Sequence, residues 1–412
     1  MYDNTEHKPR ALLVACDTGE YDAEASLAEL YALTRSAGAE AFGAMTQKRP
    51  ALDTATCVGS GMVREIADFC RKHEIELLIF DCELSPTQIR NLETATNVRV
   101  VDRTMLILDI FAASARSREG KLQVELAQLR YLLPRLSGRG TALSRLGGGI
   151  GTRGPGETKL ETDRRHIRTR IRSLQAQLDA VEKRRALIDR RRKKDGIVTV
   201  ALVGYTNAGK STLMNTLTHA GVLAEDRLFA TLDPTARALK LPNGFSVMLI
   251  DTVGLVRRLP HHLIQAFHST LEQAAGADIL LNVCDASSPE AQEHLDVTRT
   301  LLAQLGCRGT VIPVMNKCDR VPSLQEIPSI GGVRISAKTG EGIPRLLAAI
   351  EKALPVTIHK VSLLLPFTQN SLAAKIRQEG TLLSEQYTAD GLAVTAYVGD
   401  ALFARVLPYL QN

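Results

Sequence analysis

One stretch of the sequence decides the fold around it: Gly204-Tyr205-Thr206-Asn207-Ala208-Gly209-Lys210-Ser211. An apolar, β-branched run over residues 197–203 precedes it, and a helical pattern over residues 212–219 follows it. A strand, a glycine loop and a helix in this order form a phosphate-binding loop, in which backbone N–H groups close around phosphates. Lys210 would add a positive charge, and the Ser211 hydroxyl can ligate Mg²⁺. The stretch predicts a nucleoside triphosphate as the ligand.

A second segment, Asp251-Thr252-Val253-Gly254, lies where a nucleotide-sensing loop would follow a strand. Its aspartate can hold Mg²⁺ through water, and the N–H of its glycine can sense a γ-phosphate. Two strand-like runs, residues 236–241 and 245–251, flank an Asn-Gly turn signal and predict a β-hairpin that ends in this segment. A threonine hydroxyl from the loop before the hairpin would complete the sensor, and we expect Thr231 rather than Thr235 to supply it.

The base is predicted by Asn316-Lys317-Cys318-Asp319, which follows the apolar run of residues 310–315. The Asp319 carboxylate can accept paired hydrogen bonds from the N1–H and 2-amino groups of guanine, which adenine lacks. Asn316 can brace the loop, and the aliphatic stem of Lys317 can cover the purine face. Backbone N–H groups of Ser336-Ala337-Lys338 would reach the guanine O6. Alone, Asn-Lys-x-Asp is a weak signal, but in this order after a phosphate-binding loop it predicts GTP.

The overall composition is that of an ordinary globular protein. No apolar run in the 412 residues reaches the roughly 18 residues that a membrane span needs. The first ten residues are polar and do not resemble a signal peptide. The seven cysteines lack C-x-x-C spacing, so we expect buried free thiols. A cytoplasmic protein is predicted, and a peripheral fraction at the membrane is left open.

The positive charge is concentrated in one segment. Residues 159–194 contain 14 Lys and Arg against 5 Asp and Glu, whereas the whole chain carries a net charge of +6. Such a segment suggests a polyanionic partner, either a nucleic acid or a membrane surface. The alternative is a helix face that is merely solvated.

Residues 11–115 alternate strand-like and helical stretches, which predicts a parallel sheet flanked by helices. The expected strands and helices are residues 11–16, 39–46, 76–81 and 98–102, and residues 23–37, 60–73, 85–96 and 105–115, respectively. Asp17, Asp81 and Asp102 end or follow these strands, where a binding residue could lie. We expect them instead to cap the helices that come next.

Two further helical patterns predict an antiparallel hairpin that buries one apolar seam. The seam residues are Leu122, Leu126, Leu129, Leu133, Ile167, Ile171, Leu174, Leu178, Val181 and Ile188. The loop between the helices, residues 146–157, holds six glycines. It can be a flexible linker, a second anion site that uses backbone N–H groups and Arg153, or a surface that orders against a partner such as RNA.

Four domains are predicted in all. After the phosphate-binding domain, the order of elements is β-α-β-β-α, which predicts a small α+β unit. A docking or autoinhibitory role and a purely structural role are equally open for this unit. The predicted domains are an α/β domain, the helical hairpin, the GTPase domain and the α+β domain, at residues 1–115, 116–195, 196–356 and 357–412.

Several motifs closely resemble the HflX family of ribosome-associated GTPases. They are the phosphate-binding loop, Gly-Gly-Ile-Gly-Thr-Arg-Gly-Pro-Gly-Glu-Thr at 148–158, Leu-Glu-Thr-Asp-Arg-Arg at 160–165, and Phe-Ala-Thr-Leu-Asp-Pro-Thr at 229–235. The resemblance covers residues 11–355 and, more weakly, the tail. It implies an α/β protein, with a P-loop GTPase domain preceded by a parallel α/β domain with a helical hairpin and followed by a small α+β domain. It also implies binding to the large (50S) ribosomal subunit and its rRNA and, as in bacterial members, splitting or rescue of stalled ribosomes.

The resemblance also implies which residues form the site. Mg²⁺ would be held by Ser211 and Thr231, and hydrolysis would involve Lys210, Thr231, Gly254 and Asn207. The residues expected to contact GTP are Gly204, Tyr205, Thr206, Asn207, Ala208, Gly209, Lys210, Ser211, Phe229, Ala230, Thr231, Leu232, Asp233, Asp251, Thr252, Val253, Gly254, Asn316, Lys317, Cys318, Asp319, Ser336, Ala337 and Lys338.

Three positions bear on how such a site would work. Leu255 stands where Ras-like enzymes carry a water-orienting glutamine and where the family usually has Phe, so we expect slow intrinsic hydrolysis. Asn207 can help to hold K⁺ beside the phosphates, although bracing of the loop is an equally open role. Gly59-Ser60-Gly61-Met62 lacks the lysine expected there in relatives, which weakens the case for a nucleotide role in the N-terminal domain.

The sequence therefore predicts a Mg²⁺-dependent GTP hydrolase, expected to be a monomer, that presents a basic hairpin to ribosomal RNA. One alternative is a GTP-dependent RNA-binding or assembly scaffold with negligible turnover. Another is a GTPase of the membrane surface that uses the same basic helix, although this helix lacks the aromatic residues expected of an interfacial anchor.

Overall fold

The computed structural model describes residues 8–136, 155–194, 197–218, 228–229, 233, 235–258, 276–321, 331–355 and 358–411. The chain divides into two compact units. The first unit comprises Met1–Ala180, Asp226–Leu232 and Arg257–Phe267, and the second comprises Val181–Glu225, Asp233–Val256 and His268–Asn412. Two short segments of the predicted GTPase domain thus belong with the N-terminal part of the chain.

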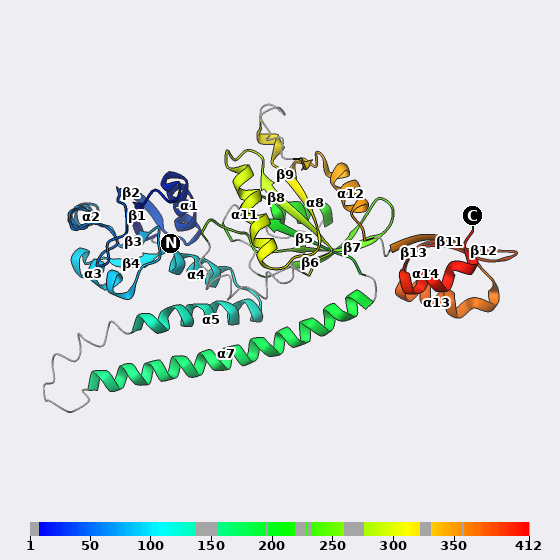
Figure 1. Cartoon of the computed structure of the whole chain (residues 1–412), viewed down its shortest axis with the longest axis horizontal. Coiled ribbons are helices and arrows are strands. Elements are labelled where there is room, and N and C mark those ends of the chain that lie inside the picture. The colour runs from blue at the N-terminus through cyan, green and yellow to red at the C-terminus, as the bar shows by residue number, and fades with distance from the viewer. Residues whose placement is uncertain are drawn as a thin grey trace, which may run out of the picture. The chain divides into compact units, whose positions relative to one another are not determined.

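The first unit contains a parallel four-stranded sheet in the order β2-β1-β3-β4 (Figure 1). Its strands are β1 (Arg10–Asp17), β2 (Glu40–Lys48), β3 (Leu77–Phe80) and β4 (Arg99–Asp102). The helices that alternate with them are α1 (Ala23–Ser36), α2 (Ser60–His73), α3 (Pro86–Thr96) and α4 (Arg103–Ser114). The predicted parallel α/β arrangement is confirmed, element by element.

Local sequence explains why this sheet forms. Residues 11–15 of β1 are fully buried, as expected of a central parallel strand covered by helices on both faces. Helix α3 begins with a capping box, in which the Ser85 side chain accepts from the Gln88 N–H and the Gln88 side chain accepts from the Ser85 N–H. Such a cap fixes where the helix starts and therefore where β4 can return to the sheet.

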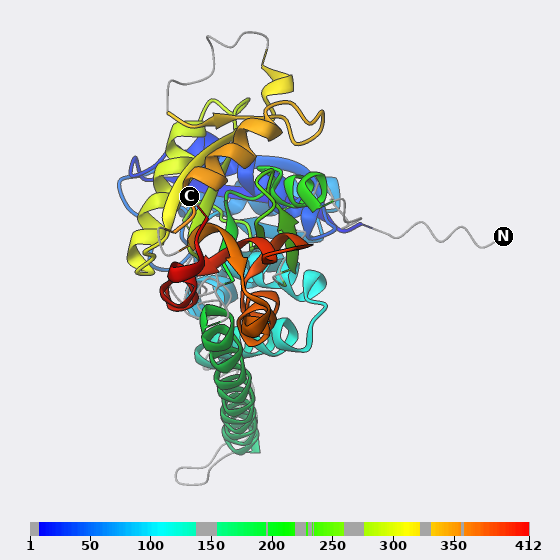
Figure 2. The ribbon, with the colours of Figure 1, turned by 90° about the vertical axis from the view of Figure 1, so that its right-hand side faces the viewer.

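The predicted hairpin is confirmed within the described residues. Helix α5 (Arg118–Arg135) lies alongside the first part of α7 (Pro155–Lys194), and the chain leaves α5 and enters α7 at the same end (Figure 1). Their shared seam contains Leu122, Leu126, Leu174 and Leu178, all buried. Arg170 and Glu125 join the helices at the surface through hydrogen bonds of 2.6 and 2.8 Å. Helix α7 is continuous in both views (Figure 2), whereas residues 146–154 of the glycine-rich loop lie outside the described part of the chain.

The second unit contains a six-stranded sheet in the order β10-β9-β8-β5-β7-β6 (Figure 1). The strands are β5 (Thr199–Gly204), β6 (Thr235–Lys240), β7 (Ser246–Asp251), β8 (Ile279–Asp285), β9 (Thr310–Asn316) and β10 (Val333–Arg334). All are parallel except β6, which forms the predicted hairpin with β7. The helices are α8 (Lys210–Thr218), α11 (Ala291–Gln304) and α12 (Ile343–Lys352), with a short η3 (Cys318–Arg320). Since parallel strands end at the same edge, the loops after β5, β7, β8 and β9 gather there.

The C-terminal part of the second unit is a three-stranded antiparallel sheet in the order β11-β13-β12. Its elements are β11 (Ile358–Leu365), η4 (Phe367–Gln369), α13 (Asn370–Glu379), β12 (Thr381–Thr388), β13 (Gly391–Gly399), α14 (Asp400–Val406) and η5 (Leu407–Tyr409). The predicted β-α-β-β-α order is confirmed. Phe245 and Tyr397 pack edge to face, with ring centroids 5.1 Å apart, and join this sheet to the core of the second unit.

Among the described helices, none combines the length and the apolar content that crossing a membrane requires.

Candidate nucleotide-binding site

The predicted phosphate-binding loop connects the end of β5 to the start of α8. Gly204 ends the strand with φ +140°, and a Cβ atom there would lie 2.1 Å from the Val283 carbonyl oxygen. Gly209 has φ +89°, and a Cβ atom there would lie 2.3 Å from Nδ2 of Asn316. Both positions therefore require glycine for conformation and for space. The loop turns sharply enough to aim the first N–H groups of α8 at a ligand.

Lys210 is buried at the centre of this loop. Its Nζ donates to the carbonyl oxygens of Gly204 and Tyr205, at 3.0 and 2.7 Å. Burial lowers the pKa of Lys210 to about 8, although the nearby Asp251 carboxylate favours the charged form. A phosphate group would supply negative charge to this ammonium group and raise its pKa again.

Ser211 and Asp251 bring two oxygen atoms together beside the loop. Ser211 is the second residue of α8 and Asp251 ends β7, and the Ser211 hydroxyl lies 2.8 Å from Oδ2 of Asp251. The hydroxyl of Thr252 donates to the Leu202 carbonyl oxygen at 2.6 Å, which holds the segment after Asp251 against β5. A hydroxyl and a carboxylate are hard oxygen donors of the kind that Mg²⁺ prefers, so these residues fit that ion.

The segment after β7 pairs with the phosphate-binding loop through its backbone. The N–H of Leu255 donates to the Gly204 carbonyl oxygen at 3.1 Å, and the N–H of Thr206 donates to the Leu255 carbonyl oxygen at 2.8 Å. Gly254 lies so close to Thr206 that a Cβ atom on it would approach Cα of Thr206 to 2.8 Å. Leu255 is only 4% exposed, so the residue at the position of the Ras-like glutamine is fixed in the interior.

The predicted base-recognition residues lie at the end of β9 and after β10. Asn316 uses both ends of its amide: Nδ2 donates to the Ala208 carbonyl oxygen at 2.8 Å, and Oδ1 accepts from the Ala337 N–H at 2.9 Å. Asp319 accepts a hydrogen bond of 2.6 Å from the buried Ser336 hydroxyl. The loop that would read guanine is thereby attached to the loop that would hold phosphate.

One residue beside this loop was missed by the sequence analysis. Nζ of Lys317 lies 2.7 Å from Oδ2 of Asp285, which ends β8. Lys317 has φ +61°, an uncommon conformation that this ion pair helps to hold. The only sequence signal for Asp285 was a carboxylate at the end of a buried strand, which by itself is weak.

A second missed contact lies on the other side of the phosphate-binding loop. The rings of Tyr205 and His294 are stacked, with centroids 3.8 Å apart and an interplanar angle of 18°. His294 lies on α11, 89 residues further along the chain, and nothing in its local sequence marks it. The stack holds the tyrosine side chain of the loop against α11.

The structure brings together most, though not all, of the predicted site residues. Asp233 and Val253 belong to the second unit with the loops described above, and so do Cys318 and the exposed Lys338. Phe229 belongs to the first unit, where its ring lies 4.5 Å from that of Phe111. Ala230, Thr231 and Leu232 lie outside the described residues.

Asn207, the candidate K⁺ ligand, is exposed and has φ +58°. Within the described residues no hydrogen bond holds its side chain, so the loop-bracing role finds no support there. A side-chain oxygen that is open to solvent beside the phosphate-binding loop is compatible with a cation ligand.

The capping prediction for the strand-end aspartates is correct for one residue of the three. Asp102 accepts from the Met105 N–H at 2.9 Å and caps α4. Asp17 instead accepts from the Gly19 N–H in a turn, because α1 begins six residues after Asp17 and is capped by Asp22. Asp81 was also wrongly predicted, because the guanidinium groups of Arg103 and Arg258 occupy its carboxylate.

The buried carboxylate of Asp81 lies between two arginines. Arg103, at the start of α4, is 2.7 Å away, and Arg258 is 2.5 Å away. Arg103 also contacts Glu29 and donates to the Arg257 carbonyl oxygen at 3.2 Å. Burial raises the pKa of Glu29, and the Arg103 charge opposes this rise. Ion pairs and hydrogen bonds thus hold Arg257 and Arg258 within the first unit. These two residues follow the predicted nucleotide-sensing segment.

Models of three protein families match successive parts of the chain. Their descriptions are GTP-binding GTPase N-terminal, GTP-binding GTPase Middle Region and 50S ribosome-binding GTPase, and they match residues 24–112, 114–192 and 199–317. Among solved structures, a GTP-binding protein from Sulfolobus solfataricus in complex with GDP is 24% identical, with a TM-score of 0.44, and the match covers 84% of this chain and 98% of that one.

Full-length relatives are much more similar. A GTPase HflX from Caldanaerobacter subterraneus is 49% identical over 400 residues, which cover 97% of this chain and 93% of the relative. GTPase HflX from Escherichia coli is 43% identical over 399 residues, which cover 95% of this chain and 93% of the relative. Identity at this level over nearly the whole length agrees with the motifs in the phosphate-binding loop, and the chain therefore belongs to the HflX family of GTPases.

Proposed function

We propose that this protein is a GTP-hydrolysing switch that binds the large ribosomal subunit through its basic hairpin and separates or rescues stalled or idle ribosomes. The observation that carries the nucleotide part is the Asn316 side chain, which joins the predicted guanine loop to the phosphate-binding loop through hydrogen bonds of 2.8 and 2.9 Å. A site in which the two loops are held in fixed positions relative to each other suits a guanine nucleotide with a phosphate chain.

Mg²⁺ is the metal ion that we propose for this site. Ser211 would ligate it directly and Asp251 through water, with Thr231 as a further ligand from the segment before β6. Bound there, the ion would neutralise charge on the β- and γ-phosphates. Lys210 would add its own charge, and the Gly254 N–H would donate to the γ-phosphate. K⁺ near Asn207 is a second proposal, and equal hydrolysis rates in KCl and NaCl would exclude it.

The exposed arginines of α7 support a polyanionic partner. Arg165, Arg168 and Arg172 are exposed and follow the spacing i, i+3 and i+7, so they share one helix face. Arg170, by contrast, is engaged by Glu125 of α5. An exposed arginine row on one helix face suits the phosphate backbone of RNA, whose binding weakens steeply with added salt.

A charge-reversal experiment tests the ribosome assignment. Changing Arg165, Arg168 and Arg172 to Glu should abolish co-sedimentation with large subunits and leave GTP affinity unchanged. The matched control reverses Arg64, Arg71 and Lys72, which are exposed on α2 and change the net charge equally. Normal ribosome binding by the α7 variant, or equal loss in the control, would remove α7 as the contact surface.

The scaffold alternative is favoured by one observation, the burial of Leu255 at the position of the water-orienting glutamine. GTP hydrolysis by the purified protein in KCl, with and without large subunits, separates the two functions. A large rise with subunits supports the switch. Hydrolysis that stays negligible with ribosomes bound would leave only the scaffold.

A further inference from the structure

Two of the seven free cysteines lie against each other in the first unit. The Sγ atoms of Cys57 and Cys82 are 3.2 Å apart, and the two thiol groups share a hydrogen bond. Cys57 lies in the loop between β2 and α2, and Cys82 follows β3, 25 positions further along the chain. A disulfide bond holds its sulfur atoms about 2.05 Å apart, so this pair must close by about 1.2 Å to form one.

A tight backbone turn holds Cys57 in place. The Asp53 N–H donates to the Cys57 carbonyl oxygen at 2.8 Å, and the Cys57 N–H donates to the Asp53 carbonyl oxygen at 2.9 Å. The Gln88 side chain of α3 donates to the same Asp53 oxygen at 2.7 Å. Cys57 has φ +65°, a conformation that a cysteine rarely adopts. The turn, rather than the intrinsic preference of the residue, therefore fixes where the Cys57 sulfur lies.

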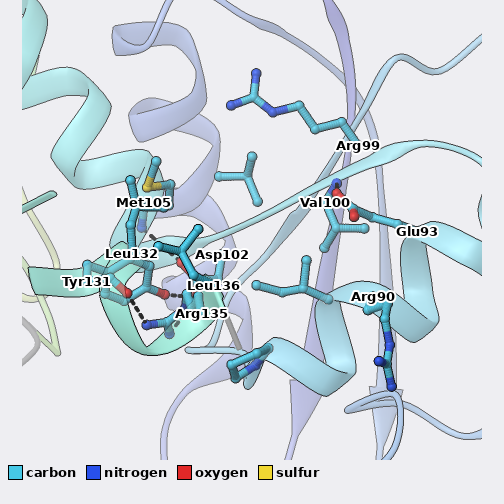
Figure 3. Close-up of a pocket in the computed structure, with 13 residues that line it drawn as sticks. Arg90, Glu93, Arg99, Val100, Asp102, Met105, Tyr131, Leu132, Arg135 and Leu136 are labelled. Atoms are coloured by element: carbon cyan, nitrogen blue, oxygen red, sulfur yellow. Dashed lines mark hydrogen bonds and ion pairs between the residues drawn. The ribbon is translucent and has the colours of Figure 1, made fainter. Parts of the chain in front are cut away.

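Hydrogen bonds on both sides hold the backbone around Cys82. The Asp81 N–H donates to a carbonyl oxygen of β1 at 2.9 Å, and the Leu84 N–H donates to the Asp102 carboxylate at 3.1 Å. Arg135, which lies beside Asp102 (Figure 3), donates to the Leu84 carbonyl oxygen at 3.0 Å. Both thiols are thus attached to a fixed backbone, so rotation of the two side chains must close the pair.

The two sulfur atoms differ in their access to solvent. Cys57 is 0% exposed, whereas Cys82 is half-buried. A small oxidant can therefore reach Cys82, which has the Cys57 thiol in contact with it. The hydrogen bond with Cys57 and burial both raise the pKa of Cys82, so little of this thiol is ionised at neutral pH. Since the thiolate is the reactive form, oxidation should be slow and should need an excess of oxidant.

Two further cysteines, Cys16 and Cys70, belong to the same apolar core. Each is 3% exposed, so neither offers its sulfur to an oxidant in solution. Burial raises the pKa of Cys16, and the charge of Cys82 adds to this rise, which places Cys16 near the pair. Cys16 is therefore the alternative partner for Cys82 that an experiment must exclude.

We propose that Cys57 and Cys82 form a reversible disulfide bond when the protein meets a hydroperoxide. The Cys82 thiolate attacks a peroxide oxygen, the O–O bond breaks, and Cys82 becomes a sulfenic acid while hydroxide leaves and takes up the thiol proton. The Cys57 sulfur then attacks the Cys82 sulfur. The S–S bond forms, the S–O bond breaks, and water leaves with the Cys57 proton. Two thiols and one hydrogen peroxide thus give one disulfide and two water molecules.

The bond would attach the loop before α2 to the segment after β3. Cys82 directly follows Asp81, whose carboxylate is paired with Arg258. Arg258 in turn follows the predicted nucleotide-sensing segment by four residues. Oxidation would therefore constrain the residue next to the Asp81–Arg258 pair.

Peptide mapping of the full chain tests the proposal. The protein should lose two of its seven thiols in hydrogen peroxide, and dithiothreitol should restore them. The four cysteines of this core fall in separate tryptic peptides, residues 11–35, 49–64, 65–71 and 73–90. Mass spectrometry should find peptides 49–64 and 73–90 joined. A link between 73–90 and 11–35, the absence of any link, or failure of dithiothreitol to reverse it would overturn the proposal.

Variants identify the sulfur that is attacked. In Cys57→Ser the sulfenic acid of Cys82 has no thiol to resolve it, so dimedone should trap it at least tenfold more than in the unaltered protein. Cys82→Ser should give neither a link nor a dimedone adduct at the buried Cys57. Cys70→Ser, a matched change of a buried thiol in the same core, should form the link at the unaltered rate. An adduct at Cys57 would overturn the assigned order of attack.

Mapping of the unaltered protein requires no variant to fold, so the link itself can be tested independently of these substitutions.

Discussion

Arg258 donates a hydrogen bond of 2.5 Å to the carboxylate of Asp81 and another of 3.0 Å to the carbonyl oxygen of the same residue, 177 positions away in the chain. Its guanidinium group also lies 3.7 Å from the centroid of the Tyr21 ring. Asp81 is 1% exposed, so its charge depends on Arg258 and Arg103 for compensation. Charged hydrogen bonds to a buried carboxylate contribute more to stability than surface ion pairs do.

Arg258→Gln should therefore destabilise the first unit by about 1.5–3 kcal/mol, the usual contribution of hydrogen bonds to a charged group. The midpoint of urea unfolding, followed by circular dichroism, measures this. The control is Arg71→Gln, because Arg71 and Asp68 form an ion pair whose side chains are 74% and 71% exposed. An equal shift for the two variants would mean that burial of Asp81 adds nothing to its pairing with Arg258.

GTP binding should depend on pH through Lys210. In the free protein, burial lowers its pKa to about 8, and bound phosphate should raise it. Below pH 8 both states are protonated, so affinity is constant. As pH rises above 8, the free protein loses a proton that the complex keeps, so affinity falls by up to about tenfold per pH unit. Binding at pH 8 should take up about half a proton, which calorimetry in two buffers of different ionisation enthalpy detects.

Lys210→Arg provides the control for this pH dependence. Its guanidinium group stays charged throughout the range, so the variant should bind more weakly but lose the pH slope above pH 8. An unchanged slope in the variant would assign the titration to another group.

Leu255→Gln should leave intrinsic GTP hydrolysis within about threefold of the unaltered rate, far below the effect of a well-placed catalytic group. Backbone hydrogen bonds to Gly204 and Thr206 fix residue 255, and its side chain is buried. A glutamine there could not reach a water molecule at the γ-phosphate without breaking this pairing. Single-turnover hydrolysis measures the rate, and a rise of a hundredfold would show that the pairing opens when GTP binds.

Gly254→Ala should lower hydrolysis at least about tenfold, because a Cβ atom would force Gly254 away from Thr206 and displace its N–H. The double variant with Thr206→Gly removes Cγ2 of Thr206, the closest atom at 2.6 Å, and should recover part of the rate. No recovery would mean that the backbone contact, and not the threonine side chain, limits this position.

Asp319→Asn should weaken GTP at least about a hundredfold and improve xanthosine triphosphate, whose 2-oxo group accepts where guanine donates. The matched control is Asp285→Asn, which removes the partner of Lys317 and should weaken both nucleotides alike. Isothermal titration of both nucleotides gives the ratio of the affinity for GTP to the affinity for xanthosine triphosphate. A constant ratio in Asp319→Asn would place base recognition elsewhere.

The sequence alone predicted most of the fold, because local patterns determine it. Strand and helix alternate in residues 11–115, and the parallel sheet follows from that order. The loops around Lys210 and Asn316 carry short motifs with a direct chemical meaning. In each case the information lies within a few residues of the element that it determines.

Contacts between residues that are far apart in the sequence leave no such local pattern. Nothing near Asp81 shows that Arg258 occupies its carboxylate, and a strand-end aspartate before a helix usually caps it, as Asp102 does. The backbone pairing of Leu255 does not depend on its side chain, so the residue type at position 255 could not predict this pairing.

The amide of Asn316 has a consequence for which triphosphates can fit. Because one side chain fixes both Ala208 and Ala337, the distance between the place for the base and the place for the phosphates is set before any nucleotide arrives. Some analogues keep the guanine base and the phosphates but replace the sugar with a longer or a flexible acyclic linker. Such analogues should not bind, because the distance between their base and their phosphates does not match the fixed distance in the site.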